Sequence, residues 1–159
     1  MNNSKVATTY TWIIGYGNPG RQDDGIGPCF ITRLAQRLPE HLSPHISLQE
    51  NYQLTVEDAL EACDYQRIIF VDASLNGTEP FSYQPVDTRA GGEFGSHSIS
   101  PAGLIQLCNT LYQHQPEASI LGIRGYQFDD FEEKLSPQAQ CNVEAALDFL
   151  ITTLEAHYA

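Results

Sequence analysis

Three places in the sequence hold side chains that can bind a metal ion or move a proton. An acidic pair, Asp23 and Asp24, stands in a glycine-rich segment, Asp72 ends a hydrophobic run, and His97 lies in a polar stretch shortly before a proline. Carboxylates and an imidazole can leave open coordination positions on a first-row metal, where water or further ligands bind. This combination is typical of a site that meets additional ligands.

The acidic pair argues against a nucleotide site in the segment Gly15–Gly27. Three glycines of this segment match the G-x-G-x-x-G spacing of dinucleotide-binding loops. Two negative charges would then stand at the helix start that receives the pyrophosphate, and they would oppose a phosphate there. No Gly-Lys-Ser/Thr follows, so a P-loop is excluded as well. Carboxylates at this point suit a cation.

Each residue also has a purely structural interpretation when it is taken alone. Asp23 or Asp24 can cap the following helix and complement its dipole, and we assign that role to Asp23 more readily than to Asp24. Asp72 can satisfy backbone donors in a turn, and His97 can be a solvated loop histidine. Their convergence on one edge of a sheet would favour a shared site, but spacing alone does not identify the reaction.

The elements that must position these residues alternate between strands and helices. Hydrophobic runs predict strands at 10–16, 46–48, 67–71 and 118–123, with an edge strand at 80–86 because Pro85 would interrupt a central ladder. Apolar spacing predicts helices at 26–38, 55–63, 101–113 and 137–157. Ser100 and Ser136 each precede a proline and are the expected N-caps of the last two helices.

This order predicts one α/β domain over residues 1–159. We expect a three-layer α/β/α sandwich with a mostly parallel, twisted sheet of about five strands, one edge strand of which can be antiparallel. In such sheets ligands bind beyond the carboxyl ends of the strands. The acidic pair follows the first strand and Asp72 ends the third, so both should open on that edge, and the segment of His97 can reach it.

Composition limits the partners and the compartment. Asp and Glu number 20 against 8 Lys and Arg, and the net charge of -12 repels phosphate backbones, so no nucleic-acid partner is expected. No apolar run approaches the roughly 20 residues needed to cross a bilayer, and Met1–Tyr10 is polar, so no membrane segment or signal peptide is expected. The cysteines form no C-x-x-C pair, and Cys29, Cys108 and Cys141 are expected as buried free thiols in helices, which suits a cytoplasmic protein.

The order and separation of these motifs resemble those of the [NiFe]-hydrogenase maturation peptidases along nearly the whole chain. The matching motifs are Gly15-x-Gly17-Asn18, Asp23-Asp24-Gly25-Ile26-Gly27, Asp72-Ala73 after a hydrophobic strand, Ser96-His97 before a helix, Leu121-Gly122-Ile123-Arg124-Gly125 and Leu135-Ser136-Pro137. The resemblance implies a hydrolase: an endopeptidase that removes a C-terminal peptide from the nickel-loaded large-subunit precursor of a hydrogenase. That precursor is the implied partner.

By the same resemblance, the metal-binding and catalytic positions correspond to Asp24, Asp72 and His97. The implied metal is nickel, delivered by the substrate on cysteines near its C-terminus, and zinc or cadmium can replace it in the isolated protein. A nickel-dependent endopeptidase of the aspartic or metallo type would use the ion to orient the tail, polarise the scissile carbonyl or activate a water, with a carboxylate aiding proton transfer. Cleavage would then depend on completed nickel insertion.

The sequence departs from the family pattern at two points. Pro19-Gly20-Arg21 is more polar than the residues that many family members carry before the acidic pair, which affects the substrate contacts expected of this loop. The pair is Asp-Asp where Asp-Glu also occurs in the family, so Asp24 has a shorter reach to a metal.

Two other functions remain open from the sequence. Gly15-Tyr16-Gly17-Asn18-Pro19-Gly20 also resembles the opening of bacterial peptidyl-tRNA hydrolase, but the acidic pair follows it and the net charge is wrong for a tRNA ligand. A small α/β module that binds the hydrogenase subunit as a chaperone, without cutting it, would retain the same ligand residues. A cleavage assay on the nickel-loaded precursor separates the peptidase from the chaperone.

Overall fold

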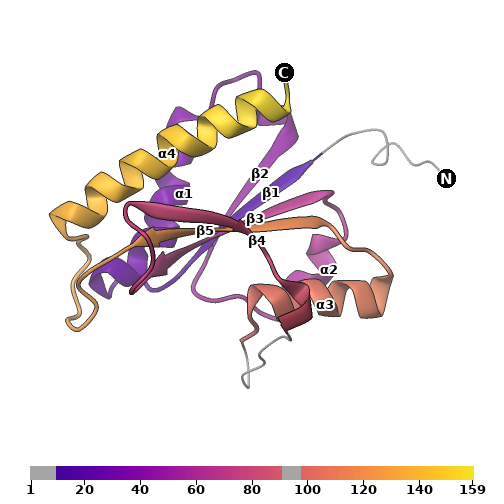
Figure 1. Ribbon diagram of the computed structural model, residues 1–159, viewed down its shortest axis with the longest axis horizontal. Coiled ribbons are helices and arrows are strands. Elements are labelled where there is room, and N and C mark those ends of the chain that lie inside the picture. The colour runs from indigo at the N-terminus through magenta and orange to yellow at the C-terminus, as the bar shows by residue number, and fades with distance from the viewer. Residues whose placement is uncertain (1–9, 91–97) are drawn as a thin grey trace.

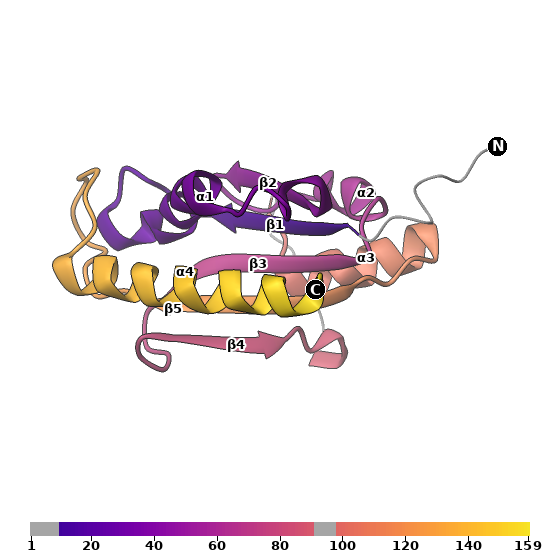
Figure 2. The ribbon, with the colours of Figure 1, turned by 90° about the horizontal axis from the view of Figure 1, so that it is seen from above.

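A five-stranded sheet forms the middle layer of the protein, for which a computed structural model describes residues 10–90 and 98–159 (Figure 1). The strands are β1 (Thr11–Tyr16), β2 (Ile46–Asn51), β3 (Arg67–Ser74), β4 (Phe81–Pro85) and β5 (Glu117–Arg124). Their spatial order is β2-β1-β3-β5-β4, and only the β4–β5 pair of this sheet is antiparallel (Figure 2). The predicted fold class and the edge position of the strand that contains Pro85 are confirmed.

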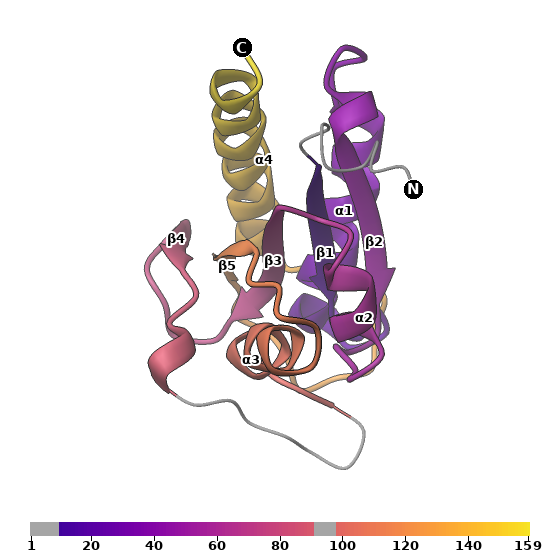
Figure 3. The ribbon, with the colours of Figure 1, turned by 90° about the vertical axis from the view of Figure 1, so that its right-hand side faces the viewer.

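Helices cover both faces of this sheet and complete the three predicted layers. The main helices are α1 (Ile26–Arg37), α2 (Asp58–Ala62), α3 (Pro101–Tyr112) and α4 (Pro137–His157). The helices α1 and α4 cover one face, while α2 and α3 lie side by side on the other (Figures 1 and 3). In the part of the chain that the structure describes, no helix has the length and apolar character needed to span a membrane.

The central strands are hydrophobic on both sides because both sides are covered. In β1, Ile13 packs into the core beneath α1 and α4, whereas Trp12 and Ile14 pack into the core beneath α2 and α3. The same alternation separates Ile69 from Phe70 in β3. Continuous apolar runs of this kind are typical of parallel strands buried on two faces.

The glycines of the first loop allow α1 to pack directly on the ends of β1 and β3. A Cβ atom at Gly27 would lie 2.7 Å from the Tyr16 nitrogen and 2.9 Å from the Val71 oxygen, closer than real Cβ contacts. Gly17 has a φ of 142°, which residues with a side chain rarely adopt. The glycine pattern therefore reflects close packing of backbone against backbone, consistent with the exclusion of a phosphate loop.

Most boundaries follow the sequence prediction, with three main differences. The second strand extends to Asn51 rather than ending at residue 48, and the third extends to Ser74 rather than ending at residue 71. The helix α2 begins at Asp58 rather than at Thr55. Ser100 and Ser136 cap α3 and α4 as predicted, since their hydroxyls accept hydrogen bonds from the nitrogens of Gly103 (3.0 Å) and Ala139 (3.3 Å).

The cysteines are all free, but the prediction that the three helical thiols are buried is only partly right. Cys108 is buried in the core beneath α3, Cys29 is half-buried on α1, and Cys141 is exposed on α4. The prediction is wrong for Cys141 because position 141 falls on the outer side of α4, away from its buried stripe of Val143, Ala146, Leu147, Leu150 and Leu154.

Candidate active site

Asp24 lies between β1 and α1, in the short 3-10 turn Gln22–Gly25 at the carboxyl edge of the sheet. The side chain is half-buried, and its Oδ2 accepts a hydrogen bond from the Asn18 nitrogen at 2.9 Å. The Asn18 side chain in turn accepts from the Gly20 nitrogen at 2.9 Å, and the Arg21 nitrogen donates to the Asn18 carbonyl at 3.1 Å. We refer to residues 18–21 as the Asn18–Arg21 turn, which holds the Asp24 carboxylate in place.

Asp72 lies in the last part of β3, at the same edge. Its Oδ1 accepts a hydrogen bond from the Ala73 nitrogen at 2.8 Å, and its carboxylate is hydrogen-bonded to the Tyr16 hydroxyl. The pKa of Asp72 is raised to about 6, chiefly by burial and also by the negative charge of Asp24, while the two hydrogen bonds act in the opposite direction. The two predicted carboxylates therefore lie close enough to interact electrostatically.

Tyr16 is a site residue that the sequence interpretation missed. The pairing of Gly15 with Val71 in the β1–β3 ladder places Tyr16 beside Asp72 on the face covered by α2 and α3. Burial and the Asp72 charge both raise the pKa of the Tyr16 hydroxyl, so it stays protonated and can donate to the carboxylate. A signal was present, because strand parity puts Tyr16 on the same face as Trp12 and Ile14.

A pair of interacting carboxylates, here with a raised pKa at Asp72, can bind a cation or transfer a proton. Mutual repulsion raises the cost of holding both negative charges, and a divalent ion between them would remove that cost. Among the described residues, the Oδ1 atom of Asp24 accepts no hydrogen bond, so it is available to a ligand. The donor set present fits a hard or borderline divalent metal, with positions left for a third protein ligand and for substrate.

The third predicted ligand, His97, lies outside the residues that the structure describes. The described residues begin again at Ser98. Ile99 packs into the core covered by α2 and α3, and its nitrogen donates to the Leu54 carbonyl at 3.3 Å. Within residues 10–90 and 98–159, no group of three or more His, Cys, Asp or Glu side chains has the arrangement of a metal site. The presence of His97 in the three-residue cluster therefore stays a prediction.

The prediction that Asp23 caps α1 is wrong. The N-cap of α1 is Gly25, and no side chain makes a capping hydrogen bond there. Asp23 is instead fully buried, and its two oxygens accept four hydrogen bonds from the segment that joins β5 to α4. The donors are the nitrogens of Tyr126 (2.7 Å), Gln127 (3.0 Å) and Ser136 (2.8 Å) and the Ser136 hydroxyl (2.7 Å).

These hydrogen bonds determine the charge state of Asp23. Burial alone would raise the pKa of Asp23, but the bonds from Ser136, Tyr126 and Gln127 outweigh it and hold the pKa below the ordinary value. Asp23 thus remains a carboxylate that ties residues 125–136 to the loop carrying Asp24. The neighbouring acids differ, since Asp23 is fully buried and accepts four hydrogen bonds, while Asp24 is half-buried and its Oδ1 accepts none from the described residues.

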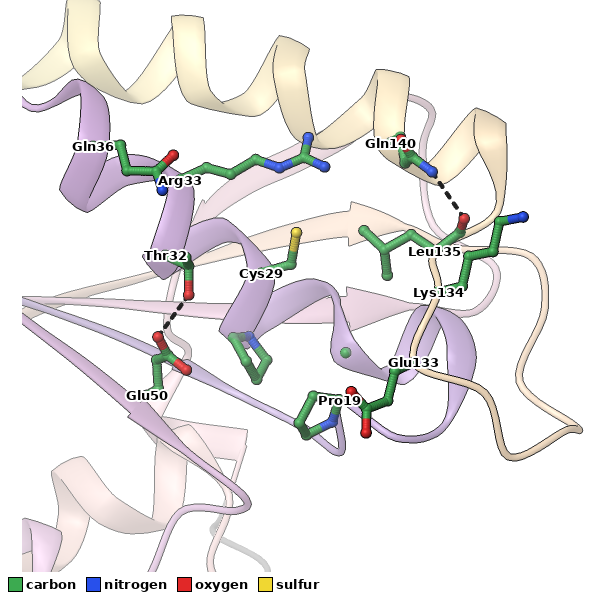
Figure 4. Close-up of a pocket in the computed structure, with 12 residues that line it drawn as sticks. Pro19, Cys29, Thr32, Arg33, Gln36, Glu50, Glu133, Lys134, Leu135 and Gln140 are labelled. Atoms are coloured by element: carbon green, nitrogen blue, oxygen red, sulfur yellow. Dashed lines mark hydrogen bonds between the residues drawn. The ribbon is translucent and has the colours of Figure 1, made fainter.

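A groove lies on the other side of the acidic loop, between α1 and the start of α4 (Figure 4). Its volume is about 680 Å³, and Arg33 and Gln36 project from α1 while Gln140 projects from α4. Neither Asp24 nor Asp72 lines it. Cys29 does line it, and burial raises the pKa of this thiol, which disfavours the reactive thiolate.

No family model and no curated protein sequence matches the chain, but solved structures do. The hydrogenase maturating endopeptidase HybD from E. coli matches with a TM-score of 0.71 at 18% identity, covering 94% of this chain and 94% of HybD. The [NiFe] hydrogenase maturation protease HycI from Thermococcus kodakarensis matches with a TM-score of 0.71 at 19% identity, covering 92% of this chain and 93% of its own. The chain has the hydrogenase maturation peptidase fold.

A third match extends this result to another lineage. The hydrogenase 2 maturation peptidase from Thaumarchaeota archaeon SCGC_AB-539-E09 has a TM-score of 0.64 at 18% identity, covering 92% of this chain and 98% of its own. The resemblance inferred from the motifs is thus confirmed at the level of the fold. Within this maturation peptidase fold, Asp24 and Asp72 lie at the predicted edge, and their roles as metal ligands stay predictions.

Proposed function

We propose that this protein is an endopeptidase that removes a C-terminal peptide from the nickel-loaded large-subunit precursor of a [NiFe]-hydrogenase. The observation that carries the proposal is the interacting pair Asp24 and Asp72 at the carboxyl edge of a sheet with the hydrogenase maturation peptidase fold. Ligands of parallel α/β sheets bind at this edge. The order of the sequence motifs supports the same activity.

In this proposal the nickel ion belongs to the substrate, and the chain's residues receive it. Asp24, Asp72 and His97 are the proposed ligands, and the free Oδ1 of Asp24 supplies one donor. The Asn18 nitrogen and the Ala73 nitrogen hold the two carboxylates in place, so their geometry is set before the substrate arrives. An unloaded precursor would lack the ion that these carboxylates bind, which explains a requirement for prior nickel insertion.

The reaction itself is hydrolysis of one peptide bond. Water adds to the scissile carbonyl, the C–N bond breaks, and the products are a new C-terminal carboxylate and a free amine on the released peptide. A bound divalent ion supplies Lewis-acid chemistry for this addition. A carboxylate of the pair would accept the proton from the attacking water.

The test is a mass measurement on the precursor. The full-length protein is incubated with nickel-loaded precursor and, separately, with nickel-free precursor, and both products are weighed by intact mass spectrometry. We expect the loaded precursor to lose the mass of a C-terminal peptide and the nickel-free precursor to keep its mass. Stable association at unchanged mass would instead identify a chaperone that binds the subunit without cutting it.

A further inference from the structure

Two aromatic side chains stand exposed beside the Asn18–Arg21 turn that holds Asp24. Tyr52, directly after β2, is 67% exposed, and Phe131, between β5 and α4, is 85% exposed. The two rings contact opposite ends of the turn, Tyr52 at Asn18 and Phe131 at Arg21.

Tyr52 is fixed to the turn and borders a hollow in the surface. The Asn18 side-chain nitrogen donates a hydrogen bond to the Tyr52 hydroxyl at 3.0 Å. Beside the ring is a cavity of about 230 Å³, which Tyr52 shares with Gly17, Pro19 and Pro28 among its lining residues. Two proline rings and one aromatic ring give this cavity largely apolar walls, and its volume suits a single side chain of a bound polypeptide.

Phe131 is held at the other end of the same turn. The Arg21 guanidinium lies over the Phe131 ring, with its carbon 5.8 Å from the ring centroid, and the Arg21 Nε donates to the Phe128 carbonyl at 2.9 Å. The backbone on either side of the ring is bonded to Gln22, which donates from its nitrogen to the Glu132 carbonyl at 2.8 Å and accepts from the Asp130 nitrogen at 3.0 Å. The exposed ring therefore stands on a backbone that hydrogen bonds hold on both sides.

Exposed aromatic rings on a fixed backbone are suited to binding another polypeptide. An aromatic ring loses little conformational entropy when it is covered, and a preordered loop has no further ordering cost to meet on binding. Rings of this kind act as the anchors of protein interfaces. The buried Asp23 carboxylate ties the segment that carries Phe131 to the acidic loop. It therefore fixes the position of this ring relative to Asp24.

The surroundings of the rings define the chemistry of the partner. Exposed carboxylates flank Phe131, at Asp129, Asp130, Glu132 and Glu133, in a chain whose net charge is -12. The carboxylates would repel an acidic segment and attract a basic one, while the exposed rings favour apolar side chains. The Asn18 nitrogen is bonded to the Asp24 carboxylate, so the Asn18–Arg21 turn, which both rings contact, lies directly beside that carboxylate.

We propose that Tyr52 and Phe131 bind the precursor's C-terminal segment on the two sides of Asp24, and that this segment carries apolar or basic side chains at the two contacts. The inference rests on the proposed peptidase function, because it takes the precursor as the occupant. The two rings act in binding and take no part in the chemical step.

The experiment compares Tyr52→Ala and Phe131→Ala with Leu111→Ala on nickel-loaded precursor. Leu111 is 54% exposed near the end of α3, away from the acidic loop, and is the matched control. We expect KM to rise about tenfold in each aromatic variant, the usual effect of removing an interface anchor, with kcat nearly unchanged. Leu111→Ala should match the wild type.

A second readout separates this inference from the proposed function. The Kd for the precursor is measured for the same variants, with thermal unfolding to show that each is folded. If the wild type binds the precursor without cutting it, the proposed peptidase function fails. A tenfold higher Kd in both aromatic variants would still support binding by the two rings. Unchanged KM and Kd in both variants would overturn the inference, as would a fall in kcat alone or a wild type that does not bind.

Discussion

Replacing Asp23 with Asn should destabilise the protein strongly although it changes only one atom. The Asp23 Oδ2 accepts three hydrogen bonds, from Tyr126, Gln127 and the Ser136 hydroxyl, while Oδ1 accepts one from the Ser136 nitrogen. An asparagine keeps one oxygen, so its amide nitrogen must occupy the other position and face a donor. If the oxygen keeps the Oδ2 position, the buried Ser136 N–H loses its partner.

The size of the effect follows from this loss. A hydrogen bond to a charged group contributes on the order of 1.5–3 kcal/mol, and a buried donor left without a partner costs about 1–3 kcal/mol. We therefore expect the free energy of unfolding to fall by about 2–5 kcal/mol in Asp23→Asn. A carboxylate that only complemented the dipole of α1 would contribute about 0.3–1 kcal/mol, so the two interpretations give distinct results.

Urea unfolding measures this difference directly. Trp12 is the only tryptophan, is fully buried and stacks on Tyr65 at a centroid distance of 5.2 Å, so its fluorescence reports loss of the core. Asp148→Asn, at an exposed position of α4, is the matched control and should unfold like the wild type. A loss below about 1 kcal/mol in Asp23→Asn would refute the role assigned to this carboxylate.

The pH dependence of the same difference has a definite sign. The pKa of Asp23 is lowered in the folded protein, so the carboxylate stabilises the fold above its unfolded pKa of about 4, and this stabilisation is lost as the pH falls through the lower folded value. The gap in stability between wild type and Asp23→Asn should be complete at neutral pH and should narrow below about pH 4. A gap that widened in acid would contradict the assignment.

Two further substitutions test the packing and the chemistry. Gly27→Ala should lower the free energy of unfolding by about 1–3 kcal/mol, because the new methyl group would meet the Tyr16 nitrogen and the Val71 oxygen. Gly20→Ala is the control and should lower it less in the same urea experiment, because its Cβ would meet nothing closer than the Asn18 Oδ1 at 3.3 Å. Cys29→Ala should retain precursor processing, because burial raises the pKa of this thiol and disfavours the thiolate, and loss of processing in a folded variant would mean that a cysteine takes part in the reaction.

The elements were predictable where their signals are local. Continuous apolar runs marked the central strands, and Ser-Pro pairs marked the starts of α3 and α4. The second strand was predicted too short because its last residues, Gln49 to Asn51, are polar, and an edge strand pairs through its backbone without needing burial of every side chain. Thr55 is not the start of α2, since its nitrogen and hydroxyl donate to the Asp58 carboxylate in a turn that precedes the helix.

The site was predictable only in part, for reasons of distance along the chain. Asp24 and Asp72 were expected together because the carboxyl ends of neighbouring parallel strands share an edge. The role of Asp23 depends on Ser136, which is 113 residues away, so no local pattern marks it. Adjacent acids look alike in a sequence, and the tertiary fold alone makes one of them a buried tether and leaves the other open to a ligand.

The most direct test of the central claim measures precursor cleavage by Asp24→Asn and Asp72→Asn. Each asparagine keeps one oxygen, which can still accept a hydrogen bond from the Asn18 or the Ala73 nitrogen, so both variants should stay folded. A neutral amide is a poor metal ligand and cannot take a proton, so we expect neither variant to cut the nickel-loaded precursor, while Asp148→Asn cuts it like the wild type. Normal cleavage by Asp24→Asn beside a folded but inactive Asp23→Asn would contradict the account, because the roles of the two adjacent acids would then be reversed.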